Sequence, residues 1–249
     1  MPWRRCRGRR LWRERPAPPY EFADEFYWAD PWPADTTSAT LVRWWRPESL
    51  VSLSDGASLS AWADSSGNGA TATPYTAVKP VYHREVQNGL GAVLFAGTTD
   101  VLGFAQTGAI GDWTVVIVAG GLDVATNAVH YAVALTGAGV ALGGTDATFG
   151  FLGEYQDGTK NRFSTIKPTA WGVDILTPAH IYRDNVEVAY GTVTGTMDRL
   201  NFTDLGGRND AANLGVVGYL GEVLIYDGTL SDSDRADVSL YLRHRWSTP

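Results

Sequence analysis

From residue 41 onward, short apolar runs alternate with turn residues. Residues 113–119 are rich in β-branched side chains, which predicts a central strand that is buried on both faces. Residues 179–190 alternate around Asp184 and Asn185, two residue types that tolerate the left-handed angles of a tight hairpin turn. Further strands are predicted at residues 130–135, 149–155, 171–176 and 216–226. Short strands at fairly even spacing predict a sandwich of two sheets.

One helix is predicted near the C-terminal end. Ser231 provides the N-cap, and Asp234, three residues later, completes a Ser-x-x-Asp capping box. The apolar residues that share one face at helical spacing are Val238, Tyr241, Leu242 and Trp246. We expect this face to pack against the sandwich.

The composition predicts one main domain. With 249 residues, 44% hydrophobic and 12% aromatic, the chain can bury a large core.

No apolar stretch is long enough to cross a bilayer, so no membrane insertion is expected. The N-terminus lacks the apolar segment and cleavage site of a secretory signal, and the single Cys6 excludes an intramolecular disulfide. These features favour synthesis in a reducing cytosol.

The charge is divided unevenly along the chain. The net charge is −7, but residues 1–15 carry +6, which leaves −13 for residues 16–249. Residues 16–19 read Pro-Ala-Pro-Pro, which favours an extended arm over a packed element. The arginines of the arm are Arg4, Arg5, Arg7, Arg9, Arg10, Arg13 and Arg15.

An aromatic and acidic strip follows the arginines at residues 20–35. Its six aromatic side chains are too many to leave in water. The strip either lies over its own sandwich and closes the core, or docks into a neighbouring subunit; both alternatives stay open. The aromatic residues are Tyr20, Phe22, Phe26, Tyr27, Trp28 and Trp32.

The arginine arm has three interpretations. Seven arginines are competent to bind nucleic acid, but the acidic body would repel a long polyanion, so nucleic acid is disfavoured. Docking onto an acidic neighbour in an assembly is favoured, and a solvated tail is the third interpretation. We therefore divide the chain into an anchoring arm at residues 1–35 and a sandwich domain at residues 36–249.

Several short motifs occur in a characteristic order. They lie at residues 41–45, 55–56, 59–69, 88–97, 205–208, 219–227 and 230–246. In this order they resemble the concanavalin A-like lectin/glucanase jelly roll, in the branch that includes laminin-G-like domains, over residues 41–247. The resemblance implies an all-β, two-sheet antiparallel jelly-roll sandwich with a short C-terminal helix packed at the sandwich edge. It says less about function, because function lies in sites grafted on a fold.

Catalytic signatures of this superfamily are missing from the sequence. Its β-glucan-cleaving members place two glutamates and an aspartate on one face of a strand, as retaining hydrolysis requires. The nearest approaches are Glu154 with Asp157, which point to opposite faces of a strand, and residues 21–25, outside the domain. We predict no enzyme; a glycan hydrolase or lyase stays as a third hypothesis, with Glu154 as its test residue. The histidines His83, His130, His180 and His244 lack metal-ligand spacing.

Sugar binding is the commonest non-enzymatic role that the resemblance implies. It requires an exposed aromatic ring to stack on a sugar, and polar groups to bind its hydroxyls. Each candidate could equally belong to the core or the rim. The candidates from the middle strands and loops are Tyr155, Asn161, Arg162 and Trp171.

The loop at residues 64–69 is a candidate calcium site. It reads Asp-Ser-Ser-Gly-Asn-Gly, and related domains hold calcium in rim loops, which would involve Asp64 and Asn68 here. The favoured alternative is a glycine-rich turn in which Asp64 binds backbone amides. Apart from calcium, no cofactor is predicted.

Taken together, these features predict a component of a larger particle. Jelly rolls that look like this one are frequent in tail, fibre and decoration proteins of bacteriophages. The leading hypothesis is a virion structural protein, assembled in the host cytoplasm, whose arm docks onto other virion proteins or copies of itself. Its sandwich would face outward and contact host-surface glycans. The alternative is a stand-alone bacterial carbohydrate-binding module or adhesin.

Overall fold

The computed structural model describes most of the sandwich domain. The described residues are 32–97, 99–105, 112–122, 133–135, 140–144, 153–156, 160–163, 170–188, 202–207 and 216–249, with the backbone alone in the four strands between residues 133 and 163. They belong to a compact unit that runs from Pro31 to Pro249. The predicted arginine arm lies outside the described residues.

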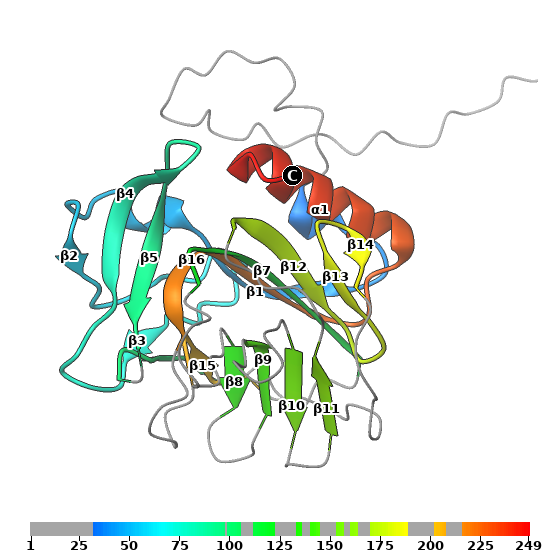
Figure 1. Ribbon diagram of the computed structural model, residues 1–249, viewed down its shortest axis with the longest axis horizontal. Coiled ribbons are helices and arrows are strands. Elements are labelled where there is room, and N and C mark those ends of the chain that lie inside the picture. Colours follow the sequence, from blue (N-terminus) through cyan, green and yellow to red (C-terminus); the bar gives the residue numbers. More distant parts are fainter. Residues whose placement is uncertain are drawn as a thin grey trace, which may run out of the picture. The chain divides into compact units, whose positions relative to one another are not determined.

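Nine of the described strands form one antiparallel sheet (Figure 1). Their order is β14-β13-β12-β7-β16-β5-β4-β2, and β16 lies at the centre, because β7 pairs along one side of it while β5 and β1 pair with the two halves of its other side. The strands are β1 (Thr40–Trp45), β2 (Ala57–Ser58), β4 (Val81–Gln87), β5 (Leu90–Ala96), β7 (Trp113–Gly120), β12 (Gly172–Leu176), β13 (Ile181–Arg183), β14 (Val186–Glu187) and β16 (Val217–Asp227).

A second antiparallel sheet contains seven of the described strands. Their order is β11-β10-β9-β8-β15-β6-β3. The strands are β3 (Thr73–Pro74), β6 (Leu102–Gly103), β8 (Val133–Leu135), β9 (Val140–Gly144), β10 (Gly153–Gln156), β11 (Lys160–Phe163) and β15 (Asp204–Leu205). The predicted all-β fold of two antiparallel sheets is confirmed.

The core between the two sheets follows from the two-residue period of a strand. Val115 and Ile117 of β7 point to this inner face and pack with Leu102 and Phe202, all at most 1% exposed. The ring of Trp113 meets Phe202 edge to face, with centroids 6.2 Å apart. Burying each of these side chains contributes roughly 1.5–3 kcal/mol.

The outer face of the nine-stranded sheet is covered by helix α1 (Asp232–Trp246), shown in red in Figure 1. Val116 and Val118 of β7 pack there in one cluster with Val238 and Leu242 of the helix. The prediction that residues 113–119 are buried on both faces is confirmed, because every residue of β7 is buried. The helix lies across the sheet face, whereas the family resemblance placed it at the sandwich edge.

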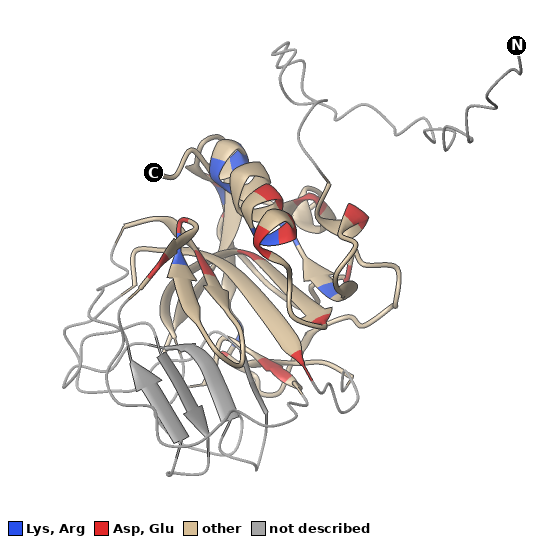
Figure 2. Cartoon of the chain, turned by 90° about the vertical axis from the view of Figure 1, so that its right-hand side faces the viewer, with Lys and Arg blue, Asp and Glu red and all other residues tan. Residues whose placement is uncertain are grey.

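The helix begins at the predicted cap, but Asp234 does not close a capping box. The Ser231 Oγ accepts a hydrogen bond from the Asp234 N–H at 3.2 Å. The Asp234 carboxylate instead accepts the backbone N–H groups of Thr37 and Ser38 at 3.0 and 2.8 Å. Acidic residues start the helix and basic residues end it (Figure 2), an order that suits the helix dipole.

The predicted hairpin turn is confirmed. Asp184 and Asn185 connect β13 and β14 with φ angles of 50° and 64°. Strands β12 and β16 match the predictions at residues 171–176 and 216–226 to within one residue at each end. Two predicted strands are described only in part, as β8 and β10. In the described part of the chain no helix combines the length and apolar character needed to cross a bilayer.

The hairpin of β4 and β5 was not predicted as a pair of strands. Its turn is Asn88-Gly89, with φ angles of 49° and 72°. Asn-Gly is the strongest short-range hairpin signal, so the sequence did carry the information.

Candidate functional site

Three partly exposed rings form a row on the outer face of the nine-stranded sheet, and we call them the aromatic row. Trp171 lies just before β12, Tyr219 lies on β16 and His83 lies on β4. The centroids of Trp171 and Tyr219 are 6.2 Å apart and their planes differ by 29°. His83 stands at 77° to Tyr219, with centroids 6.0 Å apart. The row therefore has two nearly parallel rings and an upright third ring.

Two glycines lie beneath the row: Gly120, the last residue of β7, and Gly121, which follows it. A Cβ atom on Gly120 would lie only 2.3 Å from the Trp171 ring, so the indole lies directly on this backbone. Gly121, with φ +61°, lies beneath Tyr219, where a Cβ atom would be 3.4 Å from the ring. Gly120 is the last residue of β7, pairs with Tyr219 and leaves room for Trp171.

Trp171 also stacks on Trp246, the last residue of α1. The two indoles are nearly parallel, at 13°, with centroids 5.2 Å apart. Trp246 is completely buried and lies over Gly221, where a Cβ atom would clash with its ring at 2.5 Å. The row is thus supported by the helix as well as the sheet.

A buried carboxylate holds Trp246 in place. Glu222 of β16 is 0% exposed and accepts the indole N–H groups of Trp246 at 3.0 Å and Trp44 at 2.8 Å. The Arg245 guanidinium also donates to Glu222, and its other side donates to Glu48. The network connects β1, β16, α1 and the 3₁₀ helix η3 (Pro47–Leu50). Trp246 was predicted on the apolar face of the helix, whereas Glu222, Arg245 and Glu48 were not selected from the sequence.

A carboxylate also holds His83. Its Nδ1 lies 3.3 Å from Asp55 Oδ1, and that same oxygen accepts the N–H of Arg84 at 2.9 Å. These contacts, the Arg84 hydrogen bond first, hold the pKa of Asp55 below its ordinary value. The imidazole beside this carboxylate meets Tyr219 edge to face.

A second buried ion pair lies on β12 and β13. Asp174 is 1% exposed and accepts a hydrogen bond from Arg183 Nη1 at 2.7 Å. Burial raises the pKa of Asp174 to about 6, even though the guanidinium opposes this shift. The neighbours Val173 and Ile175 pack toward α1, so Asp174 points to the opposite face of the sheet.

The predicted sugar-binding residues fall in two different sheets. Tyr155 on β10 lies opposite Asn161 on β11, and Arg162 lies opposite Glu154 in the same hairpin. Their side chains are outside what the structure describes. Trp171 lies just before β12 of the nine-stranded sheet, where it joins Tyr219 and His83, two residues that were not sugar-binding candidates from the sequence. No short-range pattern connects these three positions.

The candidate calcium loop is closed by its own hydrogen bonds. Asp64 accepts the N–H groups of Trp44 at 2.9 Å and Ser66 at 2.8 Å, and also the Ser66 hydroxyl at 2.8 Å. The Asn68 amide donates to the Val42 carbonyl at 3.0 Å. In the described part of the chain, no three His, Cys, Asp or Glu side chains lie together in a way that could hold a metal ion. Calcium at Asp64 and Asn68 stays a prediction, and binding would have to displace these bonds.

Of the predicted anchor residues, Trp32 is the one whose side chain is described. It packs edge-on against Trp44 and Tyr241 of its own unit, with centroids 4.8 and 5.6 Å away. Tyr226 donates a hydrogen bond to the Pro33 carbonyl at 2.9 Å, within the 3₁₀ helix η2 (Pro33–Asp35). For Trp32, packing on its own sandwich is therefore the interpretation that the structure favours. The other anchor residues lie outside the described part of the chain.

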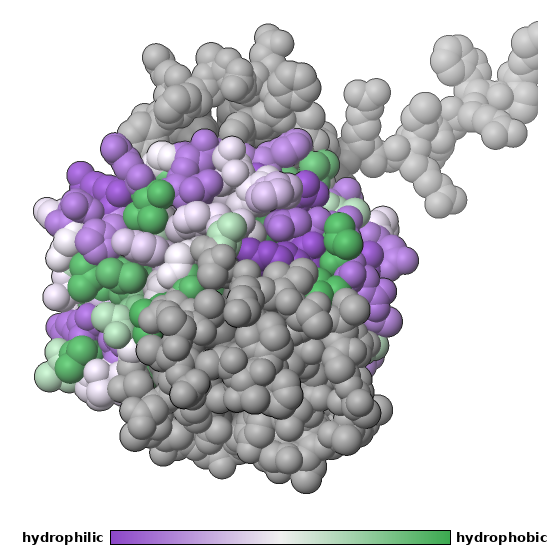
Figure 3. All heavy atoms as spheres, in the orientation of Figure 1, coloured by the Kyte–Doolittle hydropathy of each residue, from purple (hydrophilic) through white to green (hydrophobic). Residues whose placement is uncertain are grey.

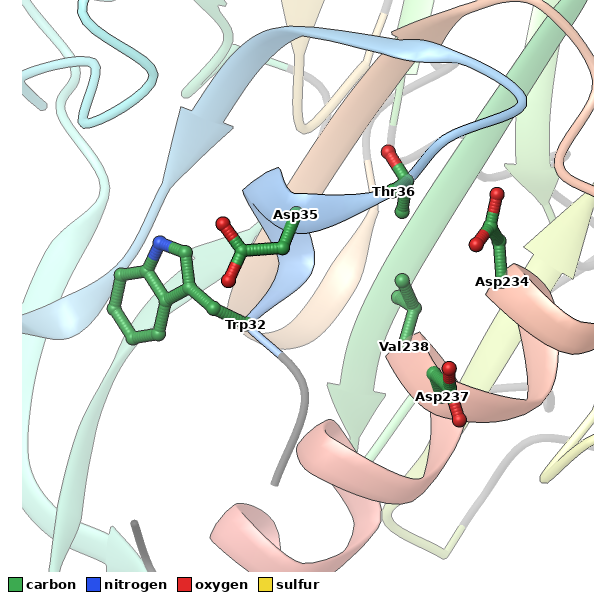
Figure 4. Close-up of a pocket in the computed structure, with 6 residues that line it drawn as sticks. All are labelled: Trp32, Asp35, Thr36, Asp234, Asp237 and Val238. Atoms are coloured by element: carbon green, nitrogen blue, oxygen red, sulfur yellow. The ribbon is translucent and has the colours of Figure 1, made fainter. Parts of the chain in front are cut away.

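A small hollow separates this segment from α1 (Figure 4). Its volume is about 20 Å³, room for about one water molecule and far below the size of a sugar site. Its lining residues are Trp32, Asp35, Thr36, Asp234, Asp237 and Val238.

Elsewhere the described surface is mainly hydrophilic in the view of Figure 3, with smaller hydrophobic areas between. The most exposed large hydrophobic residues of the described chain come from four segments, two of the five from the loop between β3 and β4, and scattered residues of this kind are normal. They are Val51, Tyr75, Val78, Val186 and Leu240. The aromatic row is therefore the strongest candidate for a binding site.

Comparison with known proteins supports the fold. No family model matches the chain, and no curated protein matches its sequence. The sialidase of Trypanosoma rangeli in complex with 2,3-difluorosialic acid is similar, with a TM-score of 0.55 and 15% identity over 84% of this chain. The match covers 33% of the sialidase chain, so this chain spans about a third of the sialidase's length.

Two further similar structures are a domain of an arabinanase and a binding domain. Domain 4 of AbnA, a GH43 extracellular arabinanase from Geobacillus stearothermophilus solved with arabinotriose, has a TM-score of 0.54 and 16% identity, over 82% of this chain and 100% of that domain. The binding domain of Paraclostridial Mosquitocidal Protein 1 has a TM-score of 0.52 and 12% identity, over 88% and 56% of the two chains. At these identities the similarity shows the fold alone.

Proposed function

We propose that this chain is a non-enzymatic, glycan-binding β-sandwich that contacts sugar through the aromatic row. The observation that carries the proposal is the pair of partly exposed, nearly parallel rings of Trp171 and Tyr219. The apolar C–H face of a sugar ring packs on such a ring, and nearby polar groups bind its hydroxyls. His83 is the polar group beside the platform.

The similar structures support this proposal. One is an arabinanase domain solved with arabinotriose, and another is the binding domain of a mosquitocidal protein. Their shared fold is compatible with a binding module, while the residues of the aromatic row belong to this chain.

The buried carboxylates support a non-catalytic role. Glu222 and Asp174 are each paired with an arginine, and Asp204 accepts the Tyr75 hydroxyl at 2.8 Å. A retaining glycosidase instead needs two carboxyl groups about 5–5.5 Å apart, both facing the substrate. These three residues serve the packing of the sandwich, so we assign them no catalytic step.

A glycan array followed by isothermal titration calorimetry tests the proposal. The Trp171→Ala variant should bind the selected glycan about tenfold or more weakly, because a stacked ring contributes on the order of 1.4 kcal/mol. Val78 is exposed on the loop before β4, so the Val78→Ala variant is the control and should bind the glycan as tightly as the original chain does. Equal affinity of Trp171→Ala and the original chain would refute the role of the row.

A more specific proposal concerns the biological context: the chain is a component of a phage tail, tip or fibre, and its partners are other virion proteins and copies of itself. It rests on the sequence resemblance and on the arginine-rich arm, and the structural comparisons add no support. Light scattering and co-purification of the full chain against a chain beginning at Pro31 would test it. Association of the full chain alone supports an anchor, whereas two identical monomers favour a stand-alone module or adhesin.

A further inference from the structure

We propose that Arg183 is the positioning residue for Trp171, and that it controls glycan affinity by fixing the backbone next to this indole. The inference rests on the proposed glycan-binding function and adds a residue that controls the same site. It follows from three observations: the two faces of the segment around Trp171, the contacts of the guanidinium, and the residue at which the ladder of β12 begins.

The guanidinium and the indole lie on opposite faces of one short segment. Val173 packs with α1 on the outer face of the sheet, and Trp171, two residues earlier, packs against the same cluster. Asp174 lies on the opposite face, where it pairs with Arg183 of the neighbouring strand. Arg183 therefore contacts this segment from the face opposite to the indole.

Arg183 holds the backbone immediately before Trp171. Its Nη2 donates a hydrogen bond to the Ala170 carbonyl at 2.7 Å, while its Nη1 donates to Asp174 at 2.7 Å. The Arg183 side chain is 10% exposed, and its Nε lies 3.8 Å from Asp184 Oδ2. Hydrogen bonds from an ionised donor are roughly twice as strong as neutral ones, so the guanidinium is a firm anchor for this carbonyl.

Gly172 leaves room for this anchor. A Cβ atom at this position would lie 2.4 Å from Arg183 Nη2, and the nearest atoms all belong to the same side chain. The guanidinium is the far end of a flexible side chain, so it can move aside at low cost. Gly172→Ala should therefore displace Arg183 from the Ala170 carbonyl without a clash with backbone.

The ladder of the sheet stops short of Trp171. Strand β12 begins at Gly172, which pairs with Ala119 of β7. The hydrogen bond from Arg183 to Ala170 extends the fixed backbone past the indole. Without this bond the indole gains freedom, and a ligand that contacts it must then restrict that freedom at a cost in conformational entropy.

Circular dichroism of the full-length protein reports the position of the indole without any ligand. Trp171 and Trp246 are stacked with centroids 5.2 Å apart, and two indoles at this separation couple their excited states and give an exciton couplet. The difference between the spectra of the original chain and Trp171→Ala isolates this couplet. Arg183→Met and Gly172→Ala should each lose most of it.

Calorimetry with the glycan selected on the array measures the consequence for binding. Arg183→Met and Gly172→Ala should each bind it about three- to tenfold more weakly, the range expected when one more side chain must be ordered on binding. In a protein that already carries Trp171→Ala, Gly172→Ala should weaken binding no further.

Arg235→Met is the matched control. The Arg235 guanidinium lies 3.9 Å from the ring centroid of Tyr182, the residue before Arg183, and on the outer face of the sheet. The substitution thus removes a partly buried arginine beside the same strand. It should keep both the couplet and the glycan affinity.

The spectra and the affinities separate the two proposals. An unchanged couplet in both Arg183→Met and Gly172→Ala would refute the positioning role, and glycan binding would stand. A lost couplet with unchanged affinity would refute the control of binding by Arg183. If the original chain binds no glycan on the array, the proposed function fails, while the spectra still decide whether Arg183 positions Trp171. Thermal melting verifies that each variant is folded, and Gly172→Ala decides the matter if Arg183→Met is not.

Discussion

Replacing Glu222 by glutamine should strongly destabilise the sandwich. The carboxylate is completely buried and receives three donors: the indoles of Trp44 and Trp246, and the Arg245 guanidinium. Glutamine has nearly the same shape, but one of its two terminal groups is itself a donor. Either an indole N–H then faces an amide N–H, or the guanidinium loses its partner.

The expected loss of stability follows from the buried ion pair between Glu222 and Arg245. Removing one partner of a buried ion pair typically destabilises a protein by about 3–5 kcal/mol. Arg245 keeps its contact to Glu48 and glutamine can still accept one bond, so we expect the lower value, about 3 kcal/mol. For a domain of this size that lowers Tm by roughly 6–12 °C.

Urea unfolding followed by tryptophan fluorescence measures this effect. The midpoint should fall while the slope m stays constant, because the substitution changes stability and not the surface exposed on unfolding. Glu187→Gln is the matched control, since Glu187 pairs with His180 at 2.8 Å on an exposed hairpin. That substitution should change the stability by less than about 1 kcal/mol. A loss below about 1 kcal/mol for Glu222→Gln would refute the structural role of the network.

Two further predictions concern the aromatic row and the pH dependence. Gly120→Ala introduces a Cβ atom 2.3 Å from the Trp171 ring and displaces the ring, so it should weaken glycan binding. In a protein that already carries Trp171→Ala, Gly120→Ala should weaken binding no further. An equal loss of affinity in that double variant would argue against displacement of the ring. Because burial raises the pKa of Asp174 from 3.8 to about 6, the native chain holds this proton more tightly than the unfolded chain. The raised pKa of Asp174 therefore stabilises the native chain by about 3 kcal/mol below about pH 4. This stabilisation is lost as the pH rises through 6. The difference in unfolding free energy between the original chain and Asp174→Asn should therefore fall by that amount between pH 4 and 7, and a constant difference would contradict the shift.

Local patterns predicted the local elements well. The β-branched run at residues 113–119 became β7, and Asp184-Asn185 became the turn between β13 and β14, because strand burial and left-handed turns depend on a few neighbouring residues. The apolar face of α1 was also predictable from its helical period, as the burial of Val238 and Trp246 confirms.

Contacts between residues far apart in the sequence were not predictable from local patterns. Asp234 has the spacing of a capping box, but its carboxylate binds Thr37 and Ser38, almost 200 residues earlier. Trp171 was a sugar-binding candidate from the sequence, yet its partners His83 and Tyr219 were not, because nothing near them in the chain indicates that they meet.

The sequence by itself therefore determined the fold class, the principal strands, the terminal helix and the uneven charge. The tertiary structure decided the position of the helix on the sheet face, the network around Glu222 and the aromatic row. The physical reason is range: propensity, periodicity and turn chemistry act over a few residues. The order of strands in a sheet is chosen by packing of the whole domain, and that order brings residues 83, 171 and 219 together.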